Sequence, residues 1–432
     1  MKRNAIEKLI DWKQGGHKQP FFLSGVRGCG KTYLAMDFAK SFYEGALYLN
    51  FEMKNAQGTA FLDGMGQMKS FADVTAWICR IFDVPKEFLD RFLIVLDEVY
   101  EEQKLWDFLL SLCSKCGEPD TGLPSAGILM ISSRMPELPE FFLHLNLYPL
   151  QFDEFLSATG QEWYGEVIRG HFHTNHRVPG IVHEELIDRF GDYLCTGGMP
   201  AAVNEYLCFE RGDNLPEIHR AYLGHILYDI YRCYGEGEAL RMSQVLHILP
   251  IQLCKENRKF QYRLIRRGAT KTLYQRAIQE LCKAQFIRLC AREGYEGSFK
   301  AFPSDLGLLH ALAAQVGVNW SGSGTMGILS GSREGRGVDR PVLECYVMES
   351  LCACGYQPKF WESASQARLD FLIDMQGYMI PVEVKTADNT RSKSVNIYRA
   401  SHEIPYSLKI SKNNFDISNN IRTIPYYAVF CL

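Results

Sequence analysis

The chain has 432 residues, of which 47% are hydrophobic, 12% are aromatic and 22% are charged, and its formal net charge is −3. At roughly 100 to 200 residues per domain, this length predicts two to four domains. The composition excludes disordered, collagen-like and coiled-coil chains. No stretch reaches the ~20 apolar residues that a membrane helix needs, and the first residues lack the apolar core of a signal peptide. We therefore expect a soluble cytoplasmic protein without a membrane partner.

A short apolar strand, a glycine-rich loop and a helical pattern follow one another at residues 21–40. The loop contains GxxxxGK[ST] in the strand, loop and helix setting that this motif requires. Its glycines let backbone N–H groups face a phosphate, and the next helix presents its positive end to the same anion. Lys31 is expected to reach the β and γ phosphates of ATP, and Thr32 to hold Mg²⁺. The expected nucleotide-binding residues are Gly25, Arg27, Gly28, Cys29, Gly30, Lys31 and Thr32.

Residues 91–98 have the pattern of a buried parallel strand that ends in two carboxylates, Asp97 and Glu98. This pattern is typical of a Walker B strand. Asp97 is expected to bind Mg²⁺ through water, and Glu98 is expected to orient or deprotonate the attacking water. The alternative is a core strand followed by a solvated acidic loop.

Another buried strand signal, at residues 127–134, ends in Ser132, Ser133 and Arg134. Either serine could hydrogen-bond the attacking water or the γ-phosphate, so both are expected catalytic residues. Arg134 either touches a γ-phosphate, in its own or a neighbouring subunit, or is solvated. With a further strand at residues 46–52, these signals predict an α/β fold, a P-loop parallel sheet with helices on both faces and the ligand at the carboxyl ends of its strands.

The order of these motifs resembles that of AAA+ ATPases. More narrowly, the chain resembles a bacterial and archaeal family that joins an AAA-type ATP-binding domain to a C-terminal domain of unknown function. The resemblance covers nearly the whole chain and implies a homo-oligomeric ring. It rests on ILMISSR, on Leu147-Tyr148-Pro149-Leu150 with Phe152-Asp153-Glu154-Phe155, and on Tyr193-Leu194 with Gly197-Gly198-Met199-Pro200. We interpret the last four residues as a turn and a helix start.

The charge is uneven, because the segment 241–300 carries 13 Lys and Arg against 4 Asp and Glu. Its pattern predicts a winged helix with helices at 242–254 and 271–284 and a hairpin that starts at 285–289 and returns near 299–302. Clustered cations gain affinity for nucleic acid by releasing counterions from phosphates. The expected contacts are Arg263, Arg266, Arg267, Lys271 and Arg276. The alternative is a protein-packing module whose arginines pair with the acidic remainder of the chain.

The last quarter of the chain contains a strong hairpin signal, with strands at 367–374 and 378–385 around a turn at 375–377. Alternation along the second strand places Glu383 and Lys385 on the same face. With Asp370 on the first strand, these residues form D-x₁₂-E-x-K.

This spacing resembles the core of PD-(D/E)XK nucleases, although Leu369 stands where the proline of that name would be. The resemblance implies a restriction-endonuclease-like α/β domain. It also implies that Asp370 and Glu383 bind a second Mg²⁺ or Mn²⁺, that Lys385 positions or activates water, and that Glu344 is the acid on the preceding helix.

Together these patterns predict five parts: an AAA-type ATP-binding domain at 1–160, a helical lid or linker at 161–237, a winged-helix-like basic domain at 238–317, a flexible linker at 318–340 and a nuclease-like domain at 341–432. The expected function is a Mg²⁺-dependent ATPase whose nucleotide state controls the nuclease-like domain on DNA. The alternative is a non-nucleolytic ATP-dependent switch or scaffold that docks proteins or tethers nucleic acid. A small-molecule kinase shares the P-loop, but the length and the basic segment argue against it.

Overall fold

The computed structural model describes residues 1–15, 19–53, 55–114, 126–139, 142–208, 214–320, 338–363, 367–386 and 393–432. The chain divides into two compact units. The N-terminal unit comprises Arg3–Tyr148 and Lys283–Gln285, and the C-terminal unit comprises Met1–Lys2, Pro149–Cys282 and Phe286–Leu432. Among the described residues, no helix is long and apolar enough to cross a membrane.

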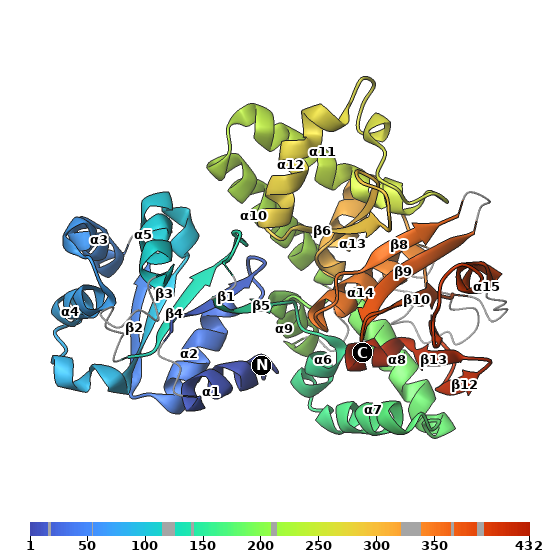
Figure 1. Ribbon diagram of the computed structural model, residues 1–432, viewed down its shortest axis with the longest axis horizontal. Coiled ribbons are helices and arrows are strands. Elements are labelled where there is room, and N and C mark those ends of the chain that lie inside the picture. The colour runs from blue at the N-terminus through green and yellow to red at the C-terminus, as the bar shows by residue number, and fades with distance from the viewer. Residues whose placement is uncertain are drawn as a thin grey trace. The chain divides into compact units, whose positions relative to one another are not determined.

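The N-terminal unit is built on a parallel sheet of five strands in the order β2-β3-β4-β1-β5 (Figure 1). Its strands are β1 (Phe21–Gly25), β2 (Gly45–Asn50), β3 (Phe92–Asp97), β4 (Ile128–Ser132) and β5 (Leu143–Leu147). Its helices are α1 (Ile6–Gln14), α2 (Lys31–Phe42), α3 (Ala56–Gly64), α4 (Phe71–Phe82) and α5 (Gln103–Ser114). The expected strand before the glycine-rich loop and the expected strands at 46–52, 91–98 and 127–134 are confirmed, whereas β5 had no separate signal.

Helices cover both faces of this sheet, as expected. Strands β1, β3 and β4 lie inside it and are almost wholly buried, which explains why they are apolar on both faces. On one face, Phe22, Leu96 and Met130 pack with side chains of α3, α4 and α5, while α1 and α2 lie on the other (Figure 1). Helix α4 begins with a capping box, in which Ser70 and Asp73 each accept the other's backbone N–H. The strands carrying the two ATPase motifs, β1 and β3, are both neighbours of β4.

The C-terminal unit contains a mixed sheet of eight strands in the order β12-β13-β11-β10-β9-β8-β6-β7. The strands are β6 (Ile287–Arg292), β7 (Phe299–Pro303), β8 (Lys359–Glu362), β9 (Arg368–Met375), β10 (Tyr378–Val384), β11 (Ser407–Ser411), β12 (Asp416–Ser418) and β13 (Ile421–Pro425). The helices are α6 (Phe152–Ala158), α7 (Glu162–Thr174), α8 (Gly180–Thr196), α9 (Pro200–Cys208), α10 (Leu215–Cys233), α11 (Glu236–Leu253), α12 (Lys271–Lys283), α13 (Leu306–Gln315), α14 (Arg340–Ala353) and α15 (Lys393–Arg399).

The expected hairpin of the last quarter is present, because β9 and β10 pair antiparallel and are joined by Gln376 and Gly377. Both turn residues have positive φ, 57° and 85°, as a tight two-residue hairpin turn requires. The backbone N–H of Gly377 donates to Asp374 over 2.9 Å. Strand β10 then pairs parallel with β11, so the hairpin lies in the middle of the sheet.

The two helices and the hairpin expected in the basic segment are present as α11, α12 and the antiparallel pair β6 and β7, whereas the winged-helix arrangement itself stays a prediction. Strand β6, however, also pairs with β8, so the expected basic domain and the expected nuclease-like domain share one sheet. One buried core includes Phe152, Leu253, Phe302 and Phe371. The subdivision at 160, 237 and 317 therefore stays a prediction within one compact unit, and residues 321–337 of the expected linker lie outside the described residues.

The Gly197-Gly198-Met199-Pro200 motif is architectural. Helix α9 begins at Pro200, as expected, and the N–H of Gly198 donates to the buried carboxylate of Asp305 over 2.9 Å. A Cβ on Gly198 would lie 2.4 Å from the carbonyl oxygen of Leu150. Because Leu150 N–H also donates to Gly198 over 2.7 Å, the motif fixes the start of the C-terminal unit.

Candidate functional site

The glycine-rich loop joins β1 to α2 and has the backbone that its sequence demands. Gly28 and Gly30 adopt φ of 83° and 99°, values that favour glycine. A Cβ on Gly25 would lie 2.4 Å from the carbonyl oxygen of Leu147 on β5, so only glycine fits there. No described side chain caps α2 at Gly30, and its first backbone N–H groups are therefore available to an anion.

Lys31 is nearly buried, and its ammonium group lies over the loop that precedes it. Its Nζ donates to the carbonyl oxygens of Gly25 and Val26 over 2.9 and 3.3 Å, and to Ser133 Oγ over 2.9 Å. All three partners are neutral. A phosphate that approached this loop would therefore meet an ammonium group that no carboxylate of the described residues contacts directly.

Thr32 and Asp97 meet at the carboxyl end of the sheet, where Thr32 Oγ1 donates to Asp97 Oδ2 over 2.9 Å. Tyr48 OH donates to the same oxygen over 2.7 Å. The other oxygen, Asp97 Oδ1, is buried and has no hydrogen-bond partner among the described residues. An unpartnered carboxylate oxygen beside a threonine hydroxyl is a donor set that suits Mg²⁺ or its bound water. These residues therefore fit the metal that the motif implies.

Glu98 follows Asp97 in a left-handed conformation, with φ of 55°. Its carboxylate accepts hydrogen bonds from the backbone N–H of Ser133 over 2.8 Å and from the Ser133 hydroxyl. Burial raises the pKa of Glu98, and the charge of Lys31 and the Ser133 hydrogen bonds only partly offset that effect. Ser133 thus links the acid expected to activate water with the lysine expected to bind phosphate.

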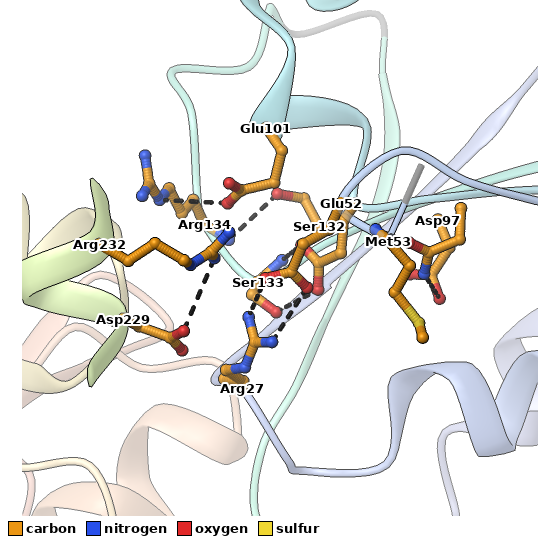
Figure 2. Close-up of polar contacts among 12 residues, drawn as sticks. Arg27, Glu52, Met53, Asp97, Glu101, Ser132, Ser133, Arg134, Asp229 and Arg232 are labelled. Carbon is orange, nitrogen blue, oxygen red and sulfur yellow. Dashed lines mark hydrogen bonds and ion pairs between the residues drawn. The ribbon is translucent and has the colours of Figure 1, made fainter. Parts of the chain in front are cut away.

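The remaining expected residues of this site have partners close by (Figure 2). Arg27 makes a bidentate ion pair with Glu52, at 2.8 and 3.0 Å, and the side chain of Arg134 lies 3.8 Å from Glu101. Ser132 Oγ is buried and accepts the backbone N–H of Arg134 over 3.0 Å, so it orients the loop after β4. Cys29 is buried against β5, and burial raises the pKa of its thiol.

Sequence reasoning missed several residues of this site. Tyr48 and Asn50 end β2 beside Asp97, and Asn50 Nδ2 donates to Tyr48 OH over 2.9 Å. Arg3, which precedes α1, donates to the carbonyl oxygen of Cys29 over 2.7 Å and so holds the loop in place. The strand signal at 46–52 could have indicated Tyr48 and Asn50, because parallel strands end at one edge, but no local pattern points to Arg3.

The basic segment of the C-terminal unit divides into two groups. Some of its cations are turned inward, since Arg258 pairs with Glu344 at 3.2 Å and Lys259 with Glu362 at 2.8 Å. The five cations expected to contact nucleic acid are all exposed: Arg263, Arg266, Arg267, Lys271 and Arg276. The segment thus contains both the internal pairing and the exposed cations that its charge suggested.

The acids of the nuclease-like pattern come together around one cavity of about 280 Å³, which Asp370, Glu383 and Lys385 line. Glu344 is fully buried on α14. Lys385 Nζ lies 3.2 Å from Glu383 Oε1, and Asp370 Oδ2 accepts the backbone N–H of Val384 over 2.8 Å. Arg340, which the sequence did not single out, reaches both Glu344 and Asp370.

Family models match three segments of the chain. Residues 17–156 match an AAA domain, residues 187–319 match a domain of unknown function (DUF8612), and residues 341–429 match another (DUF4143). No curated protein matches the chain.

Similar solved structures include the Walker-type ATPase PABY2304 of Pyrococcus abyssi, with 14% identity, a TM-score of 0.46, and 72% of this chain and 95% of that chain covered. A signal transduction ATPase with numerous domains from Pyrococcus horikoshii has 14% identity, a TM-score of 0.28 and coverage of 82% and 48%. The ORC1 protein of Aeropyrum pernix, solved with DNA, has 14% identity, a TM-score of 0.28 and coverage of 72% and 91%. Similarity at this level indicates nothing about the function of this chain.

The match of residues 17–156, with the geometry of Lys31, Thr32 and Asp97, makes the N-terminal unit an AAA-type P-loop ATPase domain.

Proposed function

We propose that the chain is a Mg²⁺-dependent ATPase that works as a nucleotide-driven switch. The observation that carries this proposal is the cluster of Lys31, Thr32, Asp97, Glu98 and Ser133 at the carboxyl ends of β1, β3 and β4. Among the described residues, Lys31 Nζ contacts carbonyl oxygens and a hydroxyl but no carboxylate, and one buried oxygen of Asp97 has no hydrogen-bond partner. The cluster therefore supports binding of a phosphate chain together with a divalent ion.

Each residue of the cluster has a separate role in ATP hydrolysis. Lys31 exchanges the carbonyl oxygens of the loop for phosphate oxygens, and the backbone N–H groups at the start of α2 bind the same phosphates. Thr32 and Asp97 hold Mg²⁺, which when bound neutralises charge on the phosphates. Glu98 takes a proton from the attacking water, and its raised pKa makes it a stronger base than an exposed glutamate.

ATP hydrolysis with Mg²⁺ tests this proposal on the full chain. Lys31→Ala and Glu98→Gln should each lower kcat by about 10² or more, because each removes a group that acts on the transferred phosphate or the water. Exposed Lys40 lies on the same helix as Lys31, and Lys40→Ala is the matched control. Hydrolysis that survives Lys31→Ala would show that the activity comes from another site or another protein.

We further propose that the switch presents a polyanion-binding surface on the C-terminal unit, formed by Arg263, Arg266, Arg267, Lys271 and Arg276. Its support is that these cations are exposed on the loop before α12 and on α12 itself, while the opposite face of α12 is buried through Tyr274 and Ile278. Phosphates of nucleic acid are the partner that such a cluster suits best. A protein partner stays the alternative interpretation of the basic segment, and a homo-oligomeric ring stays an expectation of the family resemblance.

Salt dependence of DNA and RNA binding tests this surface. Changing Arg267 and Lys271 to alanine should reduce the slope of log K against log salt by about one to two units. Arg177→Ala with Arg220→Ala removes two other exposed cations of the same unit and serves as the control. Equal losses in both double variants would mean that net charge alone drives the binding.

A metal-dependent nuclease is the second candidate function, with Glu344, Asp370, Glu383 and Lys385 as its site. The observation that favours it is that Asp370, Glu383 and Lys385 line one cavity. This candidate holds only if a divalent metal displaces Arg340 from Glu344 and Asp370. Labelled single- and double-stranded DNA and RNA, incubated with Mn²⁺ or Mg²⁺ with and without ATP, would then be cleaved by the wild type and not by Glu383→Ala. Cleavage that ATP alters only while Lys31 is intact would establish nucleotide control. Identical products from both proteins would exclude the C-terminal site as their source.

A further inference from the structure

The acids of the C-terminal site are deeply buried. Glu344 is fully buried, and the exposed fractions of Asp370 and Glu383 are 7% and 5%. Ionised carboxylates in such surroundings need an opposite charge, because burial otherwise costs several kcal/mol for each ion. In the nuclease that this site resembles, a divalent metal supplies that charge.

In this protein, side chains supply the positive charge that pairs with the buried carboxylates. Arg340 Nε donates to Glu344 Oε1 over 2.7 Å, one turn along α14, and its Nη2 donates to Asp370 Oδ1 on β9. A second guanidinium, that of Arg258, lies 3.2 Å from Glu344 Oε1. The two acids that a metal would bridge are therefore bridged by one arginine fork.

Two lysines add further positive charge beside the buried carboxylates. Lys385 Nζ lies 3.2 Å from Glu383, and Lys300, which is 6% exposed, donates to the backbone carbonyl oxygen of Asp370 over 3.2 Å. The three carboxylates thus face four cations, whereas a divalent ion needs a set of ligands with excess negative charge. Among the described residues, no group of three His, Cys, Asp or Glu is placed to hold a metal.

The charge pairing also fixes the protonation of Asp370. Burial by itself would raise its pKa, but the charges of Arg340 and Lys300 and the backbone N–H of Val384 outweigh burial and lower it. One oxygen of Glu344, Oε2, is buried without a hydrogen-bond partner among the described residues.

We propose that the guanidinium of Arg340 takes the place of a divalent metal between Glu344 and Asp370, so that the C-terminal site is charge-balanced without one. A metal would have to displace Arg340 from both acids before it could bind. The proposal depends on the C-terminal unit alone and holds whether or not the N-terminal unit hydrolyses ATP.

The test measures Mn²⁺ binding to the full chain without nucleotide, by the electron paramagnetic resonance signal of free Mn²⁺. An Asp97→Asn background removes the metal ligand of the N-terminal unit. With Arg340 intact we expect no saturable binding. Arg340→Met, which keeps the length of the side chain but not its charge, should bind one Mn²⁺ at least about tenfold more tightly. Adding Asp370→Asn should abolish that binding.

Two controls separate this effect from a change in net charge and from misfolding. Arg263→Met removes an exposed cation elsewhere in the unit and should gain no site. If Arg340→Met does not fold, the Tm of the wild type still tests the proposal, because a ligand that binds only the folded state raises Tm. The proposal predicts the same Tm with EDTA and with Mn²⁺ at millimolar concentration. A rise of several degrees that Asp370→Asn removes, or Mn²⁺ bound with Arg340 intact, would overturn it.

Discussion

The two units each gather acids and bases at one place in a sheet, but they treat the charges in opposite ways. In the N-terminal unit, Lys31 contacts carbonyl oxygens and a serine hydroxyl, and Asp97 Oδ1 has no hydrogen-bond partner among the described residues. In the C-terminal unit, Arg340 is bonded directly to Glu344 and Asp370. In the first arrangement the charges of Lys31 and Asp97 remain available to a ligand. In the second, the charge of Arg340 and those of its acids are paired with each other.

This difference teaches that acids in the right pattern do not by themselves make a metal site. What decides is whether the chain's own cations have already neutralised them. In the N-terminal unit a neutral hydroxyl, that of Ser133, stands between Glu98 and Lys31 and keeps them from pairing. The C-terminal site has no such spacer between Arg340 and its acids.

The largest expected effect concerns the free cation. Lys31→Ala should lower ATP turnover by about 10² or more, since the ammonium group acts on the phosphate that carries the developing charge. The effect should appear in kcat as well as in KM, measured by phosphate release. The comparison would fail if Arg340→Ala lowered turnover to the same extent, because Arg340 is expected to have no part in phosphate binding.

The next effect concerns stability. Glu344→Ala leaves Arg340 and Arg258 without a shared partner and should cost about 3–5 kcal/mol of unfolding free energy. Chemical denaturation with a probe in the C-terminal unit would measure it. Glu256→Ala is the control, because that side chain is 95% exposed and should change stability by less than about 0.5 kcal/mol. Equal costs would mean that the buried ion pairs contribute no more than a surface pair.

Low pH should lower the stability of the C-terminal unit through a histidine that lies outside both carboxylate clusters. Burial lowers the pKa of His310 to about 4, and His219, which stacks on it, and Asp305 face the same ring. Between this pKa and the ordinary value of 6.5, the unfolded chain binds a proton on His310 that the folded chain does not bind. The contribution of His310 to the free energy of unfolding is therefore complete above pH 6.5 and is lost as pH falls towards 4.

The loss from His310 amounts to about 3 kcal/mol. His310→Gln should flatten this part of the profile of stability against pH, whereas His176→Gln, on an exposed side chain, should not. An unchanged profile in His310→Gln would assign the acid response to other groups, the carboxylates of the Arg340 site among them.

The smallest effect concerns the spacer. Ser133→Ala removes a hydroxyl that Lys31 and Glu98 share, so kcat should fall about tenfold while KM changes less. Ser111→Ala on α5 is an exposed control. The number of nucleotides bound per chain distinguishes this from a loss of fold, because misfolding would lower that number together with the apparent kcat. A kcat that rises would mean that the hydroxyl restrains Glu98 instead of positioning it.

Much of the fold could be predicted from local patterns. The glycine-rich loop, the strand that ends in Asp97 and Glu98, and the hairpin around Gln376 and Gly377 are each specified by neighbouring residues, and each forms as expected. Strand β5 was missed because its pattern, LHLNL, alternates like an exposed strand although it pairs with β1.

The sharing of one sheet by β6 and β8 could not be predicted, because it depends on a pairing between segments about 70 residues apart. The same limit applies to the site. Arg340 stands four residues before Glu344, a helical spacing that indicates an ion pair. Its contact with Asp370 depends on the packing of α14 against the sheet, which no local pattern gives.

The most direct test of the account is the number of Mn²⁺ ions bound per chain, measured with and without a non-hydrolysable ATP analogue. We expect about one ion with the analogue and none without it, because only the nucleotide completes a metal site at Thr32 and Asp97, whereas Arg340 occupies the site between Glu344 and Asp370. An ion that binds without nucleotide and is lost in Asp370→Asn would contradict it.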